Sequence, residues 1–254
     1  MKKNILLISV ALFFYSNVLY SQEQTDSIVS QTQKKEREFS PKQLILPASL
    51  FTIGALGLGN NYVKSINEDI KRKVAGFRSD YTKADDYIQY LPVVSVYGLS
   101  IAGAKPKHDY IDRTLIVATS YLSMGIIVNS LKYTIYSPRP NFHSNNSFPS
   151  GHTATAFMGA ELVRQEYWDA SPWYGIAAYS VAASVGLMRI YNESHWATDV
   201  LAGAGAGILS ARIGYWLLPF NKRLTGRGKT IASRLIIAPY YMKQQGGIGL
   251  SYQF

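Results

Sequence analysis

Six apolar segments recur between residues 44 and 218 of this chain, and short polar joints separate them. They are longer than ordinary strands and hold Ala, Gly, Leu and Ile without strict alternation, which favours helices over a sheet. Apolar helices of one chain bury their faces against one another. The sequence therefore predicts an all-α fold, a six-helix bundle, with helices at roughly 44–59, 87–104, 113–131, 153–168, 173–190 and 197–218.

The apolar content of the chain limits how much of this bundle can lie in a membrane. Hydrophobic residues make up 47% of the 254 residues and charged residues 17%, which excludes a disordered chain. Mean hydropathy is only −0.03, and only Thr114–Leu131 approaches the ~20 residues that a bilayer crossing needs. The small residues at 203–207 allow the close helix contacts found in membrane bundles. We expect a membrane-embedded bundle, with a wholly periplasmic bundle as the alternative.

Basic residues in the joints indicate the orientation. The joint 104–113 carries three of them and the stretch 212–234 carries six, which places both on the cytoplasmic side. The joints near 132–152 and 189–197 then face outward together, provided that the short, glycine-containing segment 44–59 is not a full span. We expect an inner-membrane protein whose outward joints face the periplasm, with a soluble periplasmic or outer-membrane-associated protein as alternatives.

The two ends of the chain differ from the bundle. Residues 1–21 have a basic start and a short apolar run, which is typical of a signal peptide, with an uncleaved anchor helix as the alternative. Residues 22–43 are polar and predict an exported leader, and 44–220 form the helical domain. Within 221–254 a basic segment is followed by an alternating strand at 247–254, which predicts a short C-terminal β-hairpin with 234–241.

The chain has no cysteine, which excludes disulfides, thiolate catalysis and thiolate metal sites. Four histidines remain, and two of them lie in the outward joints among basic residues. His152 opens the fourth predicted helix, and His195 lies between the fifth and the sixth. His108 belongs to the opposite joint and is expected at the surface, and His143 is expected in a solvated loop.

The outward joints also collect groups that bind phosphate. Lys132, Arg139 and Arg189 can neutralise a doubly charged phosphate, and arginines offer forked donors to its oxygens. Ser150 and Gly151 lie at a helix start, where free backbone N–H groups attract an anion. No carboxylate cluster suited to Mg²⁺ or Zn²⁺ accompanies them in the sequence, so we expect no metal and no cofactor.

The two histidines complete a reaction centre. His195 and Asp199 are four residues apart and share one face of a helix start, so the carboxylate can orient the imidazole. His195 is then a credible nucleophile toward phosphorus, and His152 can protonate the leaving oxygen and later activate water. This pattern predicts hydrolysis of a phosphate monoester through a phosphohistidine.

The motifs K-x6-R-P at 132–140, P-S-G-H at 149–152 and R-x5-H-x3-D at 189–199 occur in this order. They resemble those of the type 2 phosphatidic acid phosphatase/haloperoxidase superfamily. The resemblance implies a six-helix layout over about 44–218. It also implies His152 as general acid, His195 as nucleophile with Asp199 as its partner, and phosphate binding by Lys132, Arg139, Ser150, Gly151 and Arg189. In one departure, Met188 stands where the family often has serine.

The expected function is a lipid phosphate phosphatase acting at the periplasmic face. Three features favour an anionic lipid headgroup as the substrate. They are export, a charge of +8 once Lys2 and Lys3 are removed with the signal peptide, and the apolar helices beside the predicted phosphate-binding residues (the phosphate cradle). The expected partners are that lipid phosphate and the membrane, and no nucleic acid. Within the resembled family, lipid A phosphate is favoured, and undecaprenyl pyrophosphate and phosphatidic acid are further candidates.

Three other functions stay open. A soluble periplasmic acid phosphatase and a vanadate-dependent haloperoxidase would use the same cradle, and a non-catalytic envelope protein would dock through the C-terminal strand. Tyr136, Asn192 and Glu193 are further hypothetical substrate contacts.

Overall fold

The computed structural model describes residues 40–77, 82–226, 235–242 and 245–252. The helices are α2 (Lys42–Gly59), α3 (Asn61–Ala75), α4 (Ala84–Ile88), α5 (Leu91–Ile101), α6 (Tyr110–Thr134), α7 (Gly151–Tyr167), α8 (Pro172–Tyr191) and α9 (Ala197–Leu224). Strands β1 (Leu235–Met242) and β2 (Gln245–Tyr252) pair antiparallel, with Leu235 opposite Tyr252. The predicted signal peptide at 1–21 and most of the predicted leader at 22–43 lie outside the described residues.

The bundle is helical as predicted, but the predicted count of six helices is not confirmed. The described residues contain eight helices, because α3 and the five-residue α4 add to the six that follow the apolar segments. α3 was missed because its sequence, NYVKSINEDIKRKVA, is largely polar and has no apolar run. The second apolar segment forms a helix of only 11 residues, α5, and α2 begins inside the predicted leader.

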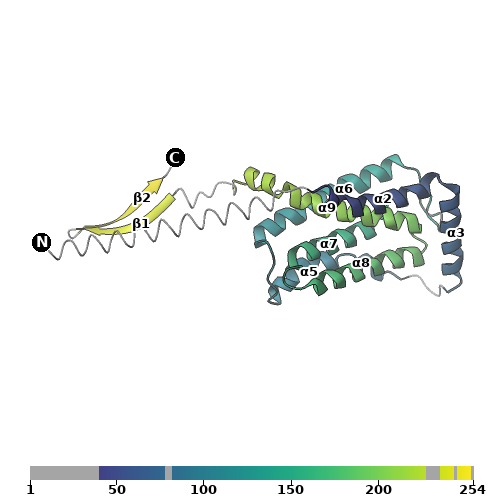
Figure 1. Ribbon diagram of the computed structural model, residues 1–254, viewed down its shortest axis with the longest axis horizontal. Coiled ribbons are helices and arrows are strands. Elements are labelled where there is room, and N and C mark those ends of the chain that lie inside the picture. Colours follow the sequence, from purple (N-terminus) through teal and green to yellow (C-terminus); the bar gives the residue numbers. More distant parts are fainter. Residues whose placement is uncertain (1–39, 78–81, 227–234, 243–244, 253–254) are drawn as a thin grey trace. The chain divides into compact units, whose positions relative to one another are not determined.

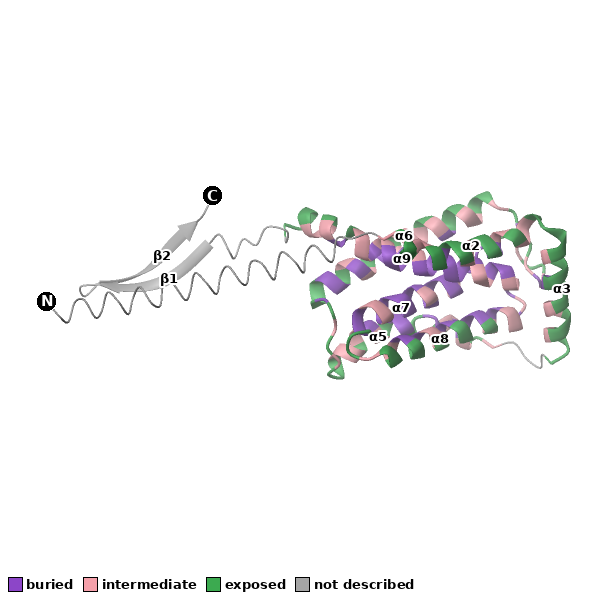
Figure 2. Ribbon diagram, in the orientation of Figure 1, coloured by how far each residue is buried: buried purple, intermediate pink, exposed green. Residues whose placement is uncertain are grey.

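The centre of the bundle is formed by α7 and α9. α7 packs against α5, α8 and α9, and α9 also packs against α2 and α6. The two central helices approach closely because Gly203 lies against the Ser150 carbonyl and Gly207 against the Ala154 carbonyl. Buried residues accordingly follow α7 and α9, while α3 lies across one end of the bundle and is largely exposed (Figures 1 and 2).

Among the described residues, three helices, α2, α6 and α9, are long and apolar enough to cross a membrane. The first two bury only 11% and 17% of their most apolar windows inside the protein, so their apolar side chains point outward. Exposed examples are Ile45 and Ile53 on α2 and Leu122 and Ile126 on α6. An outward apolar surface of this kind suits contact with lipid. Length and composition therefore give no reason to exclude 44–59 as a span. If α2 does cross the membrane, Lys42 lies on the side opposite to the outward joints, so export of residues 22–43 and a periplasmic position of those joints cannot both hold.

Candidate active site

Three chain segments meet at the end of the bundle that α3 covers. They are the loop 135–150 after α6, the first turn of α7, and the joint 192–196 between α8 and α9. The Ser150 backbone N–H donates to the Asp199 carbonyl at 3.0 Å, which ties the α7 start to α9. A Cβ atom built on Gly151 would lie 4.0 Å from Lys132 Cε, so α6 reaches the same point.

The three cations of the sequence motifs lie within one another's electrostatic field, because Arg139 and Arg189 both act on the ammonium of Lys132. Lys132 Nζ donates to the Asn146 carbonyl at 2.7 Å. Arg139 lies in a tight turn, in which its carbonyl accepts from the Phe142 N–H at 2.9 Å. The site thus gathers three positive charges on three different segments of the chain.

Arg189 is the most buried of these cations, with 4% of its surface exposed. One terminal nitrogen donates to Asp85 Oδ2 at 2.5 Å and lies 3.7 Å from Asp86 Oδ1. Its Nε is buried and has no hydrogen-bond partner within the described part of the chain. A buried donor without an acceptor is rare in folded proteins, and an oxygen of a bound anion would satisfy it.

The start of α7 offers backbone donors, but not all those that the sequence suggested. The Ser150 N–H is already bonded to Asp199, and its hydroxyl lies 2.8 Å from Thr153 Oγ1. The first turn has no side-chain cap, so the backbone N–H groups of Gly151, His152 and Thr153 are the ones left toward an anion. Ser150 therefore shapes the helix start, and its backbone N–H is not a free phosphate donor.

His195 and Asp199 are both 2% exposed, and a third residue joins them. His195 Nδ1 lies 3.9 Å from Asp199 Oδ2, beyond hydrogen-bond range. The Ser147 hydroxyl lies between them, 3.4 Å from His195 Nδ1 and donating to Asp199 Oδ2 at 2.5 Å. The same carboxylate oxygen also accepts from the Trp196 N–H at 2.9 Å, which caps α9. Nδ1 is thus directed at the carboxylate side, which leaves Nε2 for chemistry.

Burial lowers the pKa of His195 to about 4, with the neighbouring cations Lys132 and Arg189 adding to the effect and Asp199 opposing it. The imidazole is therefore neutral at pH 7, which the predicted nucleophilic role requires. Ser147 was missed at the sequence level, because nothing in the run Ser144–Ser150 distinguishes a buried serine from an exposed one.

An acidic pair on α4 was also missed. Asp86 Oδ1 lies 2.8 Å from His152 Nε2, and the fully buried Asp85 accepts from Arg189 and, at 3.2 Å, from Asn192 Nδ2. Asp85, Asp86 and His152 have donor atoms within 4.8 Å of one another, so a cluster that the sequence motifs did not indicate lies beside the site. Arg189 already forms an ion pair with Asp85 and lies 3.7 Å from Asp86 Oδ1, and its positive charge disfavours a divalent cation beside this cluster.

α3 forms hydrogen bonds to two segments at this end of the bundle. The buried Asn67 donates to Thr198 Oγ1 at 2.8 Å, and Lys71 Nζ donates to the Pro140 carbonyl at 2.7 Å. Lys71 also lies 5.6 Å from the centre of the Trp196 ring, within cation–π range. α3 thereby holds both the Arg139 loop and the start of α9.

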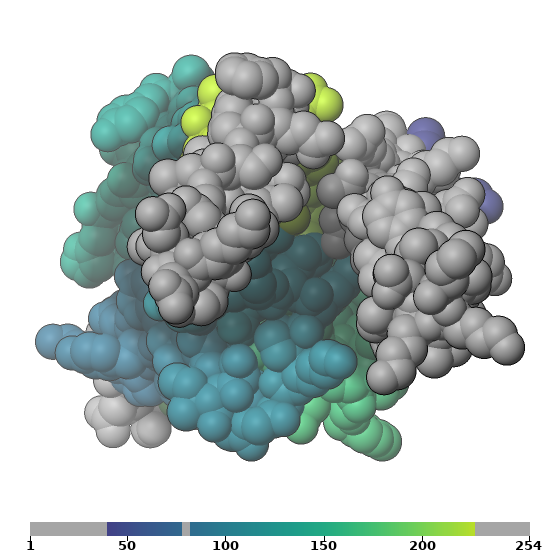
Figure 3. Space-filling model, turned by 90° about the vertical axis from the view of Figure 1, so that its left-hand side faces the viewer, coloured from purple at the N-terminus to yellow at the C-terminus, as the bar shows by residue number. Residues whose placement is uncertain are grey.

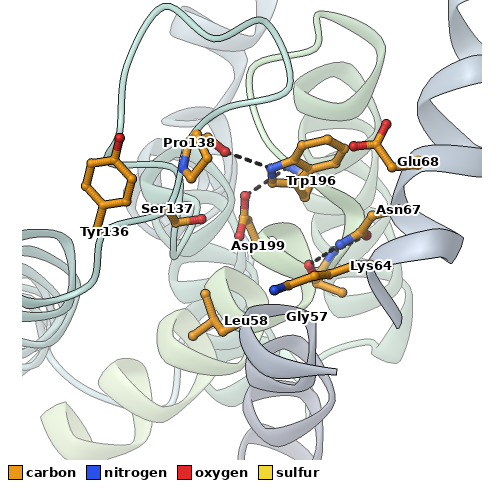
Figure 4. A pocket seen from close by; sticks show the side chains of 11 residues that line it. Gly57, Leu58, Lys64, Asn67, Glu68, Tyr136, Ser137, Pro138, Trp196 and Asp199 are labelled. Atoms are coloured by element: carbon orange, nitrogen blue, oxygen red, sulfur yellow. Dashed lines mark hydrogen bonds between the residues drawn. The ribbon is translucent and has the colours of Figure 1, made fainter. Parts of the chain in front are cut away.

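A cavity of about 250 Å³ opens between α3 and these joints. Figure 4 shows Lys64 from α3, Tyr136 from the loop and Asp199 from α9 around it. The Trp196 indole N–H closes one side by donating to the Pro138 carbonyl at 2.8 Å. Tyr136 thus lines a cavity beside the His195–Asp199 pair.

The other residues suggested as substrate contacts, and the two remaining histidines, lie in different surroundings. Asn192 is buried and holds Thr82 as well as Asp85, so it supports α4 and does not face a ligand. Glu193 has a positive φ of 50° at the turn before His195. His143 is exposed, as expected. His108 was expected at the surface but is 7% exposed, because Glu166 pairs with its Nδ1 at 2.7 Å.

The sequence profile of the PAP2 superfamily matches residues 113–223. This region of the chain, residues 113–223, belongs to the PAP2 superfamily. The match contains all eight residues that the sequence motifs single out, from Lys132 to Asp199.

Relatives with PAP2-type names share most of this region. The chain is 39% identical over 184 residues to a lipid A 1-phosphatase of Porphyromonas gingivalis, which covers 68% of this chain and 41% of that protein. It is 26% identical over 193 residues to phosphatidylglycerophosphatase B of Bacillus subtilis, covering 67% and 91%. The chain thus spans less than half of the length of the lipid A 1-phosphatase.

Among solved structures, the chain is similar to a transmembrane PAP2-type phosphatidylglycerolphosphate phosphatase from Bacillus subtilis, with 24% identity and a TM-score of 0.47 over 70% of this chain and 97% of that one.

Proposed function

We propose that this PAP2 protein is a phosphatase that removes a phosphate group from a membrane lipid. The observation that carries the proposal is the buried Arg189 guanidinium, whose free Nε shares one end of the bundle with Lys132, Arg139 and the uncapped start of α7. Such a set of donors suits the three equatorial oxygens of a phosphoryl group in transfer. The apolar outer faces of α2 and α6 support a lipid as the substrate.

The proposed reaction has two steps. In the first, His195 Nε2 attacks phosphorus, the bond to the lipid oxygen breaks, and His152 gives that oxygen its proton. In the second, His152 takes a proton from water, the water oxygen attacks phosphorus, and the bond to His195 breaks. The products are the lipid alcohol and inorganic phosphate.

Neighbouring groups prepare both histidines for these roles. Ser147 and Asp199 hold the Nδ1 side of His195 and stabilise the positive charge that forms on the ring. Burial and the nearby Arg189 lower the pKa of His152, and the carboxylate of Asp86, 2.8 Å from His152 Nε2, opposes this by favouring the protonated imidazole. Asp86 is therefore proposed as the positioning residue of the general acid.

Lipid A phosphate is the proposed substrate, acted on at the periplasmic face. The support is the 39% identity to a protein named lipid A 1-phosphatase. Phosphatidylglycerophosphate is the second candidate, supported by the similarity to a protein of that activity's name over 91% of its length.

Phosphate release from defined lipids tests the proposal. The full chain, purified in detergent, is assayed with lipid A, phosphatidylglycerophosphate, phosphatidic acid and p-nitrophenyl phosphate, with and without EDTA. We expect release from a lipid, no effect of EDTA, and complete loss in His195→Ala. The matched control is His143→Ala, an exposed histidine of the neighbouring loop, which retains activity.

Two results would contradict the proposal. Hydrolysis of the water-soluble ester alone would exclude a lipid substrate, and turnover by His195→Ala would exclude a phosphohistidine. Vanadate-stimulated halide oxidation without phosphate release would assign the cradle to a haloperoxidase instead.

A further inference from the structure

A second concentration of charge lies deep in the bundle, around Glu161 of α7. This carboxylate is 0% exposed and accepts from Arg164 Nε and Nη2 at 2.7 and 2.8 Å and from Arg212 Nε at 2.9 Å. Tyr179 and Gln165 donate to it as well, at 2.6 and 3.1 Å. A buried carboxylate with this many donors fixes the two arginine side chains in place.

The positions of Arg164 and Arg212 are fixed, but the single negative charge of Glu161 does not balance their two positive charges. Two guanidinium groups share the single carboxylate of Glu161, and they line an open pocket of about 300 Å³. Lys42, at the start of α2, adds a third positive charge. The other lining residues, Gln43, Leu46 and Gln165, are uncharged. Within the described residues, the pocket and its buried carboxylate therefore carry about two uncompensated positive charges.

Arg212 has donors to spare. Its Nε is bonded to Glu161, and its two terminal nitrogens make no hydrogen bond to the described residues and are not among the buried atoms. A guanidinium that is fixed through one nitrogen and open at two others presents a preformed fork, which matches the oxygens of a phosphate.

The pocket is remote from the proposed active site. Arg164 and Arg212 follow the first residues of α7 and α9 by roughly 20 Å of helix, at a rise of about 1.5 Å per residue. Lys42 lies at the start of α2, and α2 ends at Gly59 beside the α3 end of the bundle. The length of α2 as a candidate span places this pocket at the headgroup level of the opposite leaflet.

The surroundings of the pocket suit an amphiphile. Leu46 lines it and is 50% exposed, and the adjacent Ile45 is 63% exposed on the outer face of α2. A molecule with a phosphate in the pocket would lay an acyl chain along these side chains. Figure 3 views the bundle from the end away from α3, where the joint between α5 and α6 lies in front.

We propose that this pocket binds the phosphate headgroup of an anionic membrane phospholipid as a resident lipid, separate from the substrate. Basic pockets between membrane helices recognise anionic headgroups through the same charges and forks. The proposal needs the bundle to lie in a bilayer, and it does not depend on the phosphatase activity.

Lipid retention in the purified protein tests it. The full chain carrying His195→Ala, which prevents turnover, is titrated with phosphatidylglycerol or phosphatidylcholine and examined by native mass spectrometry. We expect preferential retention of phosphatidylglycerol, weakened about fivefold by Lys42→Gln and further by adding Arg212→Lys, which keeps the charge but removes the fork. Lys42 is exposed, so its substitution leaves the fold intact.

The control is Lys105→Gln, an exposed lysine in the joint between α5 and α6, which removes the same charge elsewhere and leaves retention unchanged. Equal weakening by Lys105→Gln, or equal retention of the two lipids, would overturn the proposal. Displacement of the lipid by millimolar inorganic phosphate would instead identify a site for free phosphate. A failed activity assay with intact lipid retention would contradict only the proposed function.

Discussion

Replacing Asp86 with asparagine separates the charge of this residue from its shape. The amide oxygen of asparagine can still accept from His152 Nε2, so the ring keeps its orientation, while the negative charge at 2.8 Å disappears. Asp85 remains in place to neutralise Arg189, so the phosphate cradle is preserved. Asp86→Asn therefore tests whether the carboxylate maintains the protonated form of the proposed general acid.

The size of the effect follows from the geometry. A hydrogen bond between charged groups contributes about 1.5–3 kcal/mol, and the lower end applies because the side chains of His152 and Asp86 are 30% and 42% exposed. Since one pKa unit corresponds to about 1.4 kcal/mol, the pKa of His152 should fall by about one unit. The first step needs protonated His152, so the alkaline limb of the kcat profile shifts to lower pH by about one unit. Above both limbs, kcat falls about tenfold, and below them it changes little.

The assay is steady-state phosphate release from the lipid substrate between pH 5 and 9, at saturating substrate. Asp169→Asn, an exposed aspartate after α7 at the other end of the bundle, is the matched control and leaves the profile unchanged. An unshifted alkaline limb would refute the argument. A lower KM with a higher kcat would show instead that Asp86 competes with the substrate phosphate for Arg189 and His152.

Three further predictions concern packing, the α3 contact and pH. Gly207→Ala should lower the free energy of unfolding by about 1–3 kcal/mol, because its Cβ would meet the α7 backbone. Gly98→Ala, whose Cβ would face open space, should not lower it. Thermal unfolding followed by intrinsic fluorescence measures both variants, and an equal loss of stability in the two would contradict the argument. Asn67→Ala leaves the buried Thr198 hydroxyl without its donor and should cost about 1–3 kcal/mol in the same melting assay, with a loss of kcat; unchanged melting and activity would show that α3 does not hold the site. Burial lowers the pKa of His195 to about 4, so the acid limb of kcat/KM should lie below pH 6.5. The free energy of unfolding should rise as pH increases from 4 to 6.5, because only the unfolded chain binds this proton in that range. An acid limb at or above pH 6.5 would argue against a neutral buried nucleophile.

The sequence predicted the central helices and the meeting point of the site because both depend on local patterns. Apolar runs mark α6, α7, α8 and α9, and the charged residues of the motifs lie directly at the ends of these helices. A bundle of antiparallel neighbours brings alternate joints to one end. Lys132, His152 and His195 could therefore be placed together without coordinates.

The supporting residues could not be found in this way, because their roles depend on contacts between distant segments. Asp86 lies 66 residues from His152, and Asn67 lies 131 residues from Thr198. α4 has five residues and α3 has a polar sequence, so neither carries an apolar signal. Ser147 lies beside motif residues, but only its 0% exposure separates it from the exposed serines of ordinary loops.

By itself, the sequence determined which segments become helices and which joints carry the cations and histidines, since hydropathy and charge belong to each residue and its near neighbours. Only the tertiary structure decided which partner each ionisable side chain of the site receives: Asp85 for Arg189, Asp86 for His152, Ser147 between His195 and Asp199. The physical reason is that a buried charge is stabilised by whatever donors the packing of other helices brings within about 3 Å. That packing depends on all the helix faces together, so the sequence of a single helix does not determine it.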